Sequence, residues 1–203
     1  MSAPAGQAPT ADAARLVTAV APRQAIEHEL SAAGLEIVGP CEGLSQRRDL
    51  MQEASLLHDF KPDEADTLGR AMVLVRARPG QVLIAEDAAG DWMFLLMTGT
   101  LDVVKRKVGA DWQSNAPEHM TRLAVLKAGA AVGEMSMLDG EPRYASCVAL
   151  SDVEAAVLTR GAVARLITDQ PAVGAKLLVK ITQMLAQRLR NTSNQLVRHL
   201  QRG

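Results

Sequence analysis

The sequence predicts an α+β protein that is mainly β, in which an antiparallel β-roll or jelly-roll barrel lies between N-terminal helices and a long C-terminal dimerisation helix. Three observations predict this class. Residues 73–160 hold short β-type runs that glycines separate at nearly regular intervals. Residues 21–72 are patterned as helices, with proline near helix starts and glycine near a stop. Residues 161–203 carry a long helical pattern with one narrow apolar stripe.

Composition limits the class of protein. The 203 residues are enough for one good core with an appendage. A hydrophobic content of 48% is typical of soluble globular proteins, and a net charge of -1 gives no overall field that would recruit nucleic acid or a membrane. No apolar run approaches the ~18–20 residues that span a bilayer, and no basic patch precedes an apolar stretch near the start, so we expect no signal peptide. Cys41 and Cys147 make no disulfide framework, which suits a cytoplasmic protein.

The segment before the β region is predicted to be a tail followed by helices. Residues 1–20 are predicted as a disordered tail, because up to about Ala14 they hold small residues and prolines with almost no large apolar side chain. Pro22 suits the first turn of a helix that ends before Gly34, and Pro62 starts another. The predicted helices are residues 22–33, 44–57 and 63–72.

Short apolar runs predict the strands of the roll: residues 73–75, 82–84, 92–97, 101–104, 123–126, 145–150 and 153–158. The glycines that separate them are Gly80, Gly90, Gly99, Gly129 and Gly140. Residues 105–121 make a long polar insert, rich in Gly, Asp, Asn and Pro. We expect a solvated hairpin loop there, and a mobile flap over a ligand is the alternative.

Two helices are predicted after the roll: residues 161–168, and residues from Pro171 to about Gln201. The second carries an apolar stripe that recurs every three or four positions: Leu178, Ile181, Leu185, Leu189, Thr192, Leu196 and Leu200. A helix of ~30 residues is ~45 Å long and would extend beyond a barrel of this size. We therefore expect a parallel homodimer through this helix, with packing on its own roll alone as the alternative.

The candidate chemistry is concentrated in residues 129–148, which read GAAVGEMSMLDGEPRYASCV. Glu134 follows Gly133 and opens about one helical turn, and Arg143 leaves a polar turn into a β-type run. A helix start attracts phosphate through its dipole and free N–H groups, and an arginine fork binds two phosphate oxygens at once. A carboxylate does not help to bind phosphate, so Glu134 is suited to accept a hydrogen bond from a sugar hydroxyl. The alternative is a first-turn acid and a surface base that bind no ligand.

Residues 132–138 and 142–147 resemble the phosphate-binding cassette of cyclic nucleotide-binding domains. The pattern of that family is roughly aromatic-Gly-Glu, a helical turn, a short loop, and Pro-Arg-x-Ala-Ser/Thr. Two positions depart from it: Val132 replaces the usual aromatic residue, and Tyr144 stands where a small residue is commoner. The resemblance covers roughly residues 56–200 and implies a β-roll that binds a cyclic nucleotide.

The resemblance also assigns the ligand-binding residues: Gly133, Glu134, Met135, Ser136, Arg143, Tyr144, Arg188, Thr192 and Ser193. It implies that Arg143 holds the cyclic phosphate and that Glu134 accepts the ribose 2′-hydroxyl. Backbone N–H groups of Met135, Ser136 and Tyr144 would complete the phosphate site.

Residues 187–193 resemble the dimerisation helix of the catabolite activator family. Thr192 and Ser193 match a pair that contacts the adenine, one of them from the partner subunit. Hydroxyls both donate and accept, so they suit the adenine amino group. Arg188 matches a helix arginine near the phosphate end of the pocket. For Thr192, a polar residue tolerated in a dimer seam is the alternative.

The function implied by the resemblance is a cyclic nucleotide sensor that prefers cAMP. Domains selective for cGMP tend to carry threonine directly after the arginine, where this chain has Tyr144. The nucleotide would draw the long helix onto the roll and change the dimer geometry. Only residues 201–203 follow the helix, far fewer than the ~60 of a helix-turn-helix domain. We therefore expect no sequence-specific DNA binding, and output to a protein effector. We also expect no membrane partner and no cofactor.

Other functions remain open at this point. A degenerate fold could serve as a protein-interaction scaffold without a nucleotide. The same fold could sense cGMP, cyclic di-GMP or haem, although two cysteines exclude a four-cysteine cluster within one chain. No nucleophile–base pair and no metal-ligand spacing is evident in the sequence, so we expect no enzyme activity.

Overall fold

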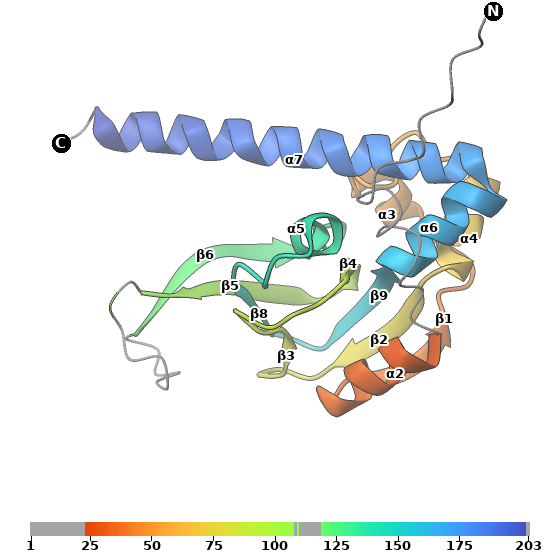
Figure 1. The fold of residues 1–203 in the computed structure, drawn as a ribbon, viewed down its shortest axis with the longest axis horizontal. Coiled ribbons are helices and arrows are strands. Elements are labelled where there is room, and N and C mark those ends of the chain that lie inside the picture. Colours follow the sequence, from red (N-terminus) through yellow and green to blue (C-terminus); the bar gives the residue numbers. More distant parts are fainter. Residues whose placement is uncertain (1–22, 108, 110–118, 202–203) are drawn as a thin grey trace, which may run out of the picture.

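The computed structural model describes residues 23–107, 109 and 119–201 (Figure 1). The elements before the roll are helix α2 (Arg23–Ala32), strand β1 (Glu36–Pro40), the 3-10 turn η1 (Leu44–Gln46), helix α3 (Arg48–Glu53) and helix α4 (Pro62–Arg70). The tail predicted over residues 1–20 lies outside the described residues. So do residues 108 and 110–118, which are most of the predicted polar insert.

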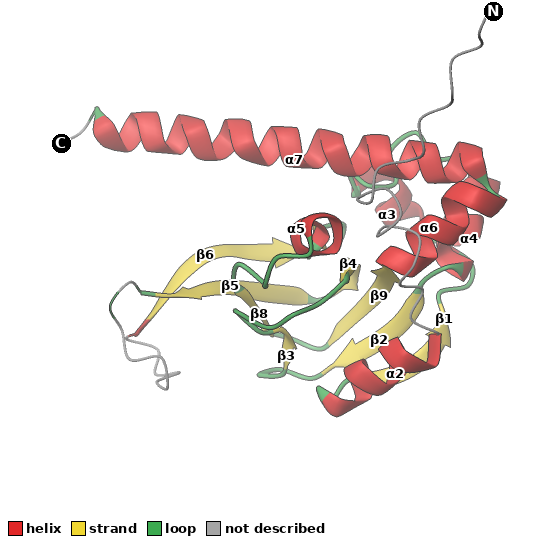
Figure 2. Ribbon diagram, in the orientation of Figure 1, coloured by secondary structure: helices red, strands yellow, loops and turns green. Residues whose placement is uncertain are grey.

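Two antiparallel sheets build the roll (Figure 2). Its strands are β2 (Val73–Ala77), β3 (Val82–Ile84), β4 (Trp92–Thr98), β5 (Thr100–Arg106), β6 (Met120–Lys127), β7 (Ala131–Val132), β8 (Ser146–Ala149) and β9 (Val153–Thr159). One sheet has five strands in the order β1-β2-β9-β4-β7, and the other has four in the order β3-β8-β5-β6. The predicted fold class, a mainly β antiparallel roll flanked by helices, is confirmed.

Strand β4 lies between β9 and β7 and is buried on both faces. Trp92, Phe94 and Leu96 point into the interior of the roll, where they meet residues of the second sheet such as Leu101. The alternate residues of β4 join a second core, which the helices build on the other face of this sheet. A strand that is covered on both sides needs apolar residues throughout, which explains the uninterrupted apolar run from residue 92 to residue 97.

The last two helices are α6 (Arg160–Asp169) and α7 (Pro171–Leu200). Val173, Leu177 and Ile181 on the first half of α7 are buried in the core between the helices. On the second half, Leu189 and Leu200 are 69% and 72% exposed. Figure 1 shows that this half runs past the short helix α5 (Glu134–Asp139) and above β6, away from the end of the protein where α3, α4 and α6 lie. In the single chain, the first half of α7 therefore buries its apolar side chains, and the second half leaves them exposed.

Strand β1 and strand β7 were not predicted. Residues 36–40 were included in the helical N-terminal segment, but they form an edge strand that pairs with β2, with Ile37 opposite Val75 and a bulge before Gly39. Gly39 and Pro40 are residues that rarely occupy central strands, and both are tolerated at an edge or bulge. Strand β7 is only two residues long, and it is a strand because it pairs with β4, which is distant in the sequence.

The single helix predicted over residues 44–57 is wrong. The chain breaks at Arg47, whose φ and ψ of -82° and 78° separate η1 from α3. Tertiary contacts explain the break. The backbone N–H and the hydroxyl of Ser45 both donate to Asp66, each at 2.9 Å, and Arg47 donates to Glu154 at 3.2 Å. These contacts outweigh the helical pattern of the sequence, because helix propensity is a weak determinant of local structure.

The polar insert is shorter than predicted. Strand β5 continues to Arg106 and β6 begins at Met120, so the ends of the segment assigned to a loop are strands that pair with each other. Among the described residues, no helix is both long enough and apolar enough to cross a membrane.

Candidate functional site

Helix α5 (Glu134–Asp139) is one short helix bounded by two glycines. Gly133 at its N-cap has φ 90° and Gly140 at its C-cap has φ 79°, a left-handed conformation that glycine adopts without strain. Gly133 is also required by space, because a Cβ there would lie 2.8 Å from Arg143 Nη1. The spacing of the cassette thus has a local physical basis.

Arg143 is buried, with 4% of its surface exposed. Its Nη1 donates to the Gly133 carbonyl at 2.9 Å, and its guanidinium carbon lies 4.5 Å from the centroid of the Trp92 ring. Nη2 is buried without a hydrogen-bond partner among the described residues. Burial lowers the pKa of the guanidinium below its usual value, and nearby negative charges, Glu29 first among them, oppose that change. An arginine remains charged in proteins, so this is a buried cation with a donor to spare.

The backbone of Arg143 is held by the loop between β3 and β4. Its N–H donates to the Ala88 carbonyl, and its carbonyl accepts from the Asp87 N–H, both at 2.9 Å. Gly90 in the same loop lies against the guanidinium, because a Cβ there would come within 2.5 Å of Nη2. The loop therefore fixes both ends of the arginine.

Glu134 is 1% exposed. One carboxylate oxygen, Oε1, accepts a hydrogen bond from Nη1 of Arg188 on α7, and Nη2 of Arg188 donates to the Ala131 carbonyl. The other oxygen, Oε2, is buried and has no partner in the part of the chain that the structure describes. Leaving such an oxygen unpaired costs about 1–3 kcal/mol or more. It is an acceptor for which a hydroxyl ligand would be a natural partner.

The other cassette residues differ in exposure. Ser136 is 4% exposed and Met135 is 50% exposed. Tyr144 is 62% exposed, and Lys105 covers its ring with its ammonium group 4.1 Å from the centroid. Lys105 also donates to the Tyr144 carbonyl at 2.6 Å and to Glu86 at 3.0 Å. Tyr144 is therefore at the surface, held from one side by Lys105.

The structure brings together four of the predicted site residues: Gly133, Glu134, Arg143 and Arg188. Met135, Ser136 and Tyr144 adjoin them in the chain. Thr192 and Ser193 are exposed on α7, beyond Arg188, and their side chains make no hydrogen bond to the cluster within the described ranges. In a single chain, the pair predicted to contact the base is thus separate from the buried charges.

The sequence did not indicate the parts that three residues play in this region: Trp92, Glu29 and Arg160. Trp92 supplies the aromatic face under Arg143, and its indole Nε1 donates to Glu29 on α2 at 2.8 Å. Arg160 donates to the carbonyls of Met137 and Ser136, at 2.6 Å and 3.0 Å, and so satisfies the last turn of α5. These contacts join segments 23 to 63 positions apart, so short-range patterns did not indicate them.

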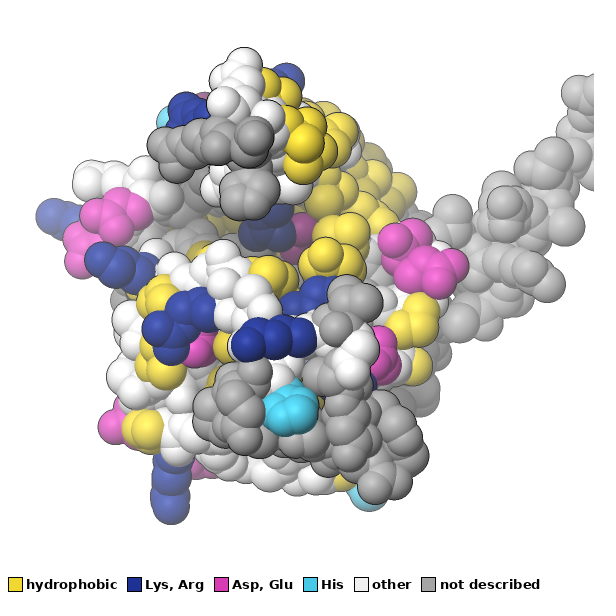
Figure 3. Space-filling model, turned by 90° about the vertical axis from the view of Figure 1, so that its left-hand side faces the viewer, with side chains coloured by type: hydrophobic (Ala, Val, Ile, Leu, Met, Phe, Trp, Pro, Cys, Tyr) yellow, Lys and Arg dark blue, Asp and Glu magenta, His cyan; other side chains and the backbone are white. Residues whose placement is uncertain are grey.

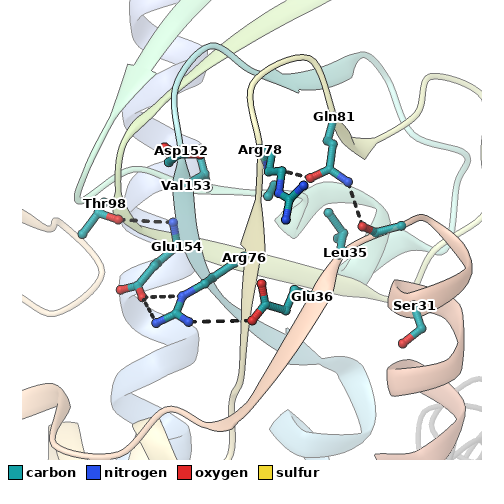
Figure 4. Close-up of a pocket in the computed structure, with 12 residues that line it drawn as sticks. Ser31, Leu35, Glu36, Arg76, Arg78, Gln81, Thr98, Asp152, Val153 and Glu154 are labelled. Atoms are coloured by element: carbon teal, nitrogen blue, oxygen red, sulfur yellow. Dashed lines mark hydrogen bonds and ion pairs between the residues drawn. The ribbon is translucent and has the colours of Figure 1, made fainter.

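A cavity of about 780 Å³ lies elsewhere, between β1, β2 and β9 (Figure 4). The charged side chains at its centre are already paired: Arg76 bonds Glu154 at 2.9 Å and lies 3.8 Å from Glu36. Gln81 donates to the Gly34 carbonyl at 2.7 Å. Among the described residues, Glu134 and Arg143 each carry a buried polar atom without a partner, and no residue that lines this cavity does. We therefore take the cassette as the functional site.

Comparisons with known proteins agree with this geometry. The profile of the family described as "Cyclic nucleotide-binding domain" matches residues 74–170. The chain is 33% identical over 117 residues to a cAMP-dependent protein kinase regulatory subunit of Aspergillus niger, a match that covers 58% of this chain and 26% of that protein. It is 26% identical over 148 residues to the CRP-like cAMP-activated global transcriptional regulator of Mycobacterium tuberculosis, which covers 73% of this chain and 61% of that one. The chain thus spans less than two thirds of the length of both relatives.

Two solved structures show the same fold. A cyclic nucleotide-binding domain from Methylobacillus flagellatus is 30% identical with a TM-score of 0.70, over 81% of this chain and 89% of that one. A catabolite activator protein of Thermus thermophilus is 26% identical with a TM-score of 0.61, over 70% and 62% of the two chains. These matches and the cassette define a regulatory domain of the type found in catabolite activators and kinase regulatory subunits, a sensor fold rather than a catalytic one. The chain belongs to the family of cyclic nucleotide-binding domains.

Proposed function

We propose that this protein is a cAMP-preferring sensor whose ligand is bound between Arg143 and Glu134. One observation carries the proposal: both side chains are buried in the family's cassette, and each keeps one polar atom without a partner among the described residues. The spare atom of Arg143 is a donor and that of Glu134 is an acceptor. A cyclic nucleotide offers the complement, an anionic phosphate for the donor and a ribose hydroxyl for the acceptor.

The phosphate site is proposed around Arg143. Its Nη2 would donate to a phosphate oxygen, and the backbone N–H groups of Met135, Ser136 and Tyr144 would add hydrogen bonds, as the cassette pattern of the family implies. Charge-assisted hydrogen bonds of this kind are about twice as strong as neutral ones. Oε2 of Glu134 would accept the ribose 2′-hydroxyl.

Ligand entry requires movement, because Glu134 and Arg143 are almost fully covered by other groups of the protein. Arg188 on α7 donates to Oε1 of Glu134, so a ribose hydroxyl on Oε2 would share the carboxylate with Arg188 and reorient this contact. The second half of α7 would then change its position relative to the roll. We propose this as the signal, a shift between two populated conformations driven by their different affinities for the nucleotide.

Base recognition is proposed for Thr192 and Ser193. Both are exposed on the uncovered half of α7, so they are free to meet a ligand or a second chain. Tyr144, where cGMP-selective domains tend to have threonine, supports a preference for cAMP over cGMP. Its exposed ring would shield the bound nucleotide from one side.

A parallel homodimer is proposed through the second half of α7. Leu189, Leu196 and Leu200 are 59–72% exposed along one stripe. Figure 3 shows hydrophobic side chains gathered on one side of this helix and continuing onto the body beneath it. A second copy would bury this stripe, at about 25 cal/mol for each Å² of apolar surface.

The output is proposed to be a protein effector. A cavity of about 550 Å³ between α5, α6 and α7 is lined mainly by apolar side chains, among them Leu138, Val163 and Leu178. It adjoins the cassette helix, so a ligand that moves α5 would change its shape. We further propose that the protein is cytoplasmic, uses no cofactor, catalyses no reaction and does not bind specific DNA sequences.

Calorimetric titration with cAMP, cGMP and cyclic di-GMP tests the proposal. We expect the wild type to bind cAMP more tightly than cGMP, and Arg143→Ala to lose most of the binding. Arg78→Ala, an exposed arginine that lines the separate cavity, is the matched control and should bind as the wild type does. Thermal unfolding of each variant shows whether it is folded. No heat with any of the three ligands would favour a scaffold role, and an unchanged Arg143→Ala variant would place the site elsewhere.

A further inference from the structure

A contact from the N-terminal helix reaches the proposed phosphate site. Glu29 on α2 accepts a hydrogen bond from the Trp92 indole at 2.8 Å, and the face of the same ring lies against the Arg143 guanidinium at 4.5 Å. Trp92 is 5% exposed and Arg143 is 4% exposed, so the ring is packed between the carboxylate and the cation. Figure 1 shows α2 on the side of the roll opposite to α7.

Glu29 also interacts electrostatically with Arg143. Burial lowers the pKa of Arg143, and Glu29 is the strongest of the charged groups that oppose the lowering, ahead of Asp91 and Glu134. Its carboxylate thus supplies part of the negative charge that stabilises the buried guanidinium in the absence of a ligand. Glu29 is itself exposed, so water and salt weaken the interaction.

Helix α2 is attached to the roll by apolar packing and by hydrogen bonds. Ile26 and Leu30 are buried against the interior of the roll, and Leu35 follows just after the helix. Polar contacts of this region include the Glu29–Trp92 hydrogen bond and the bond from Gln81 to the Gly34 carbonyl at 2.7 Å. A ten-residue helix is marginal on its own, so losing one of its contacts with the roll would shift its opening equilibrium measurably.

We propose that α2 is a ligand-responsive wall of the phosphate site, in which Glu29 fixes Trp92 against Arg143 and competes with the bound phosphate for that guanidinium. The inference rests on the proposed function. A phosphate on Arg143 brings a second negative charge near Glu29, and the two anions repel each other. Nucleotide binding therefore loosens α2, and α2 in its packed position lowers the affinity for the nucleotide, because such coupling is reciprocal.

The variant Glu29→Gln separates charge from hydrogen bonding. Its amide oxygen still accepts from the indole, but the negative charge is gone. We expect its affinity for cAMP to rise about three- to fivefold at low salt and the gain to shrink as salt is added, since the effect is electrostatic and partly screened. Glu42→Gln removes the same charge from an exposed residue that is not among the groups acting on Arg143, and it should bind as the wild type does.

Amide hydrogen exchange of α2 gives the second readout. Addition of cAMP should speed exchange at residues 26–32 of the wild-type protein, with a smaller response in Glu29→Gln. The inference alone would be overturned if Glu29→Gln bound cAMP with the wild-type affinity at every salt concentration. It would also be overturned if cAMP slowed amide exchange in α2. A wild-type protein that binds no cyclic nucleotide would overturn the proposed function, and the inference with it.

Discussion

Arg188 on α7 donates a hydrogen bond to the carboxylate of Glu134, a residue 54 positions earlier in the chain and 1% exposed. The same guanidinium reaches the Ala131 carbonyl. The long helix is thereby tied to the residue proposed to bind ribose. A ligand that moves the carboxylate of Glu134 would therefore act on α7 through Arg188.

We predict that Arg188→Ala destabilises the ligand-free protein. Removing one partner leaves a buried carboxylate unpaired, which costs about 3–5 kcal/mol in a fully buried pair. Because the Arg188 side chain is 44% exposed, we expect about 1–3 kcal/mol here. Urea unfolding measures the difference. Arg190→Ala, an exposed arginine of the same helix, should change the unfolding free energy by less than about 0.5 kcal/mol, and equal losses in the two variants would contradict the tie.

Gly90→Ala is predicted to weaken cAMP binding by at least about tenfold, which is about 1.4 kcal/mol. The new Cβ would lie 2.5 Å from Arg143 Nη2, the atom proposed to contact the phosphate. Because that atom is the end of a flexible side chain, the arginine should shift and the fold should remain. Calorimetry and thermal unfolding together test this, with Ala89→Ser in the same loop as the control. Wild-type affinity in Gly90→Ala would show that the position of Arg143 does not matter.

The thiol of Cys147 is predicted to be unreactive. Burial raises its pKa to about 12, and burial also raises that of Cys41. Thiolate is the reactive form, so neither residue should react with a disulfide reagent at pH 8 until the protein is unfolded. Rapid labelling of the native protein would show that a cysteine is accessible.

The same raised pKa gives a prediction at high pH. The folded-state pKa of Cys147 lies above the unfolded value of 9.0, so the folded state retains the proton longer. Its contribution is therefore fully present below about pH 9 and is lost as pH rises toward about 12. Cys147→Ala should show a smaller fall in unfolding free energy over this window than the wild type, and identical slopes would refute the assignment.

For the dimer, Leu189→Glu is predicted to give a monomer. Leu189 is 69% exposed on the uncovered stripe of α7, and a charge there could not be buried against a second copy. Light scattering measures the mass, with and without cAMP. Asn194→Glu lies on the opposite face of the helix by its spacing and should leave a dimer. A monomeric wild type under both conditions would remove the basis of this prediction.

The parts of the fold that depend on local pattern could be predicted. The resemblance of residues 132–138 and 142–147 to the cassette places Gly133, Glu134 and Arg143 in one site, and the structure brings them together because glycine conformation and close packing require that spacing. The start of α4 at Pro62 and the length of α7 also follow from local signals. The roles in ligand binding remain predictions.

The parts that depend on long-range contacts could not be predicted. The Trp92–Glu29 bond joins residues 63 positions apart. Strand β1 exists because β2 offers an edge to pair with, although Gly39 and Pro40 disfavour a strand. The helix expected over residues 44–57 is interrupted because Ser45 and Arg47 donate hydrogen bonds to the carboxylates of Asp66 and Glu154, which are distant in the sequence. The assignment of Thr192 and Ser193 to base recognition involves a second chain and stays a prediction.

A structure determined with cAMP bound tests the central claim most directly. We expect the cyclic phosphate against Arg143 Nη2, the ribose 2′-hydroxyl on Glu134 Oε2, and Arg188 moved from its present contact. A nucleotide bound at another place, with Arg143 and Glu134 still covered by the protein's own side chains, would contradict the account.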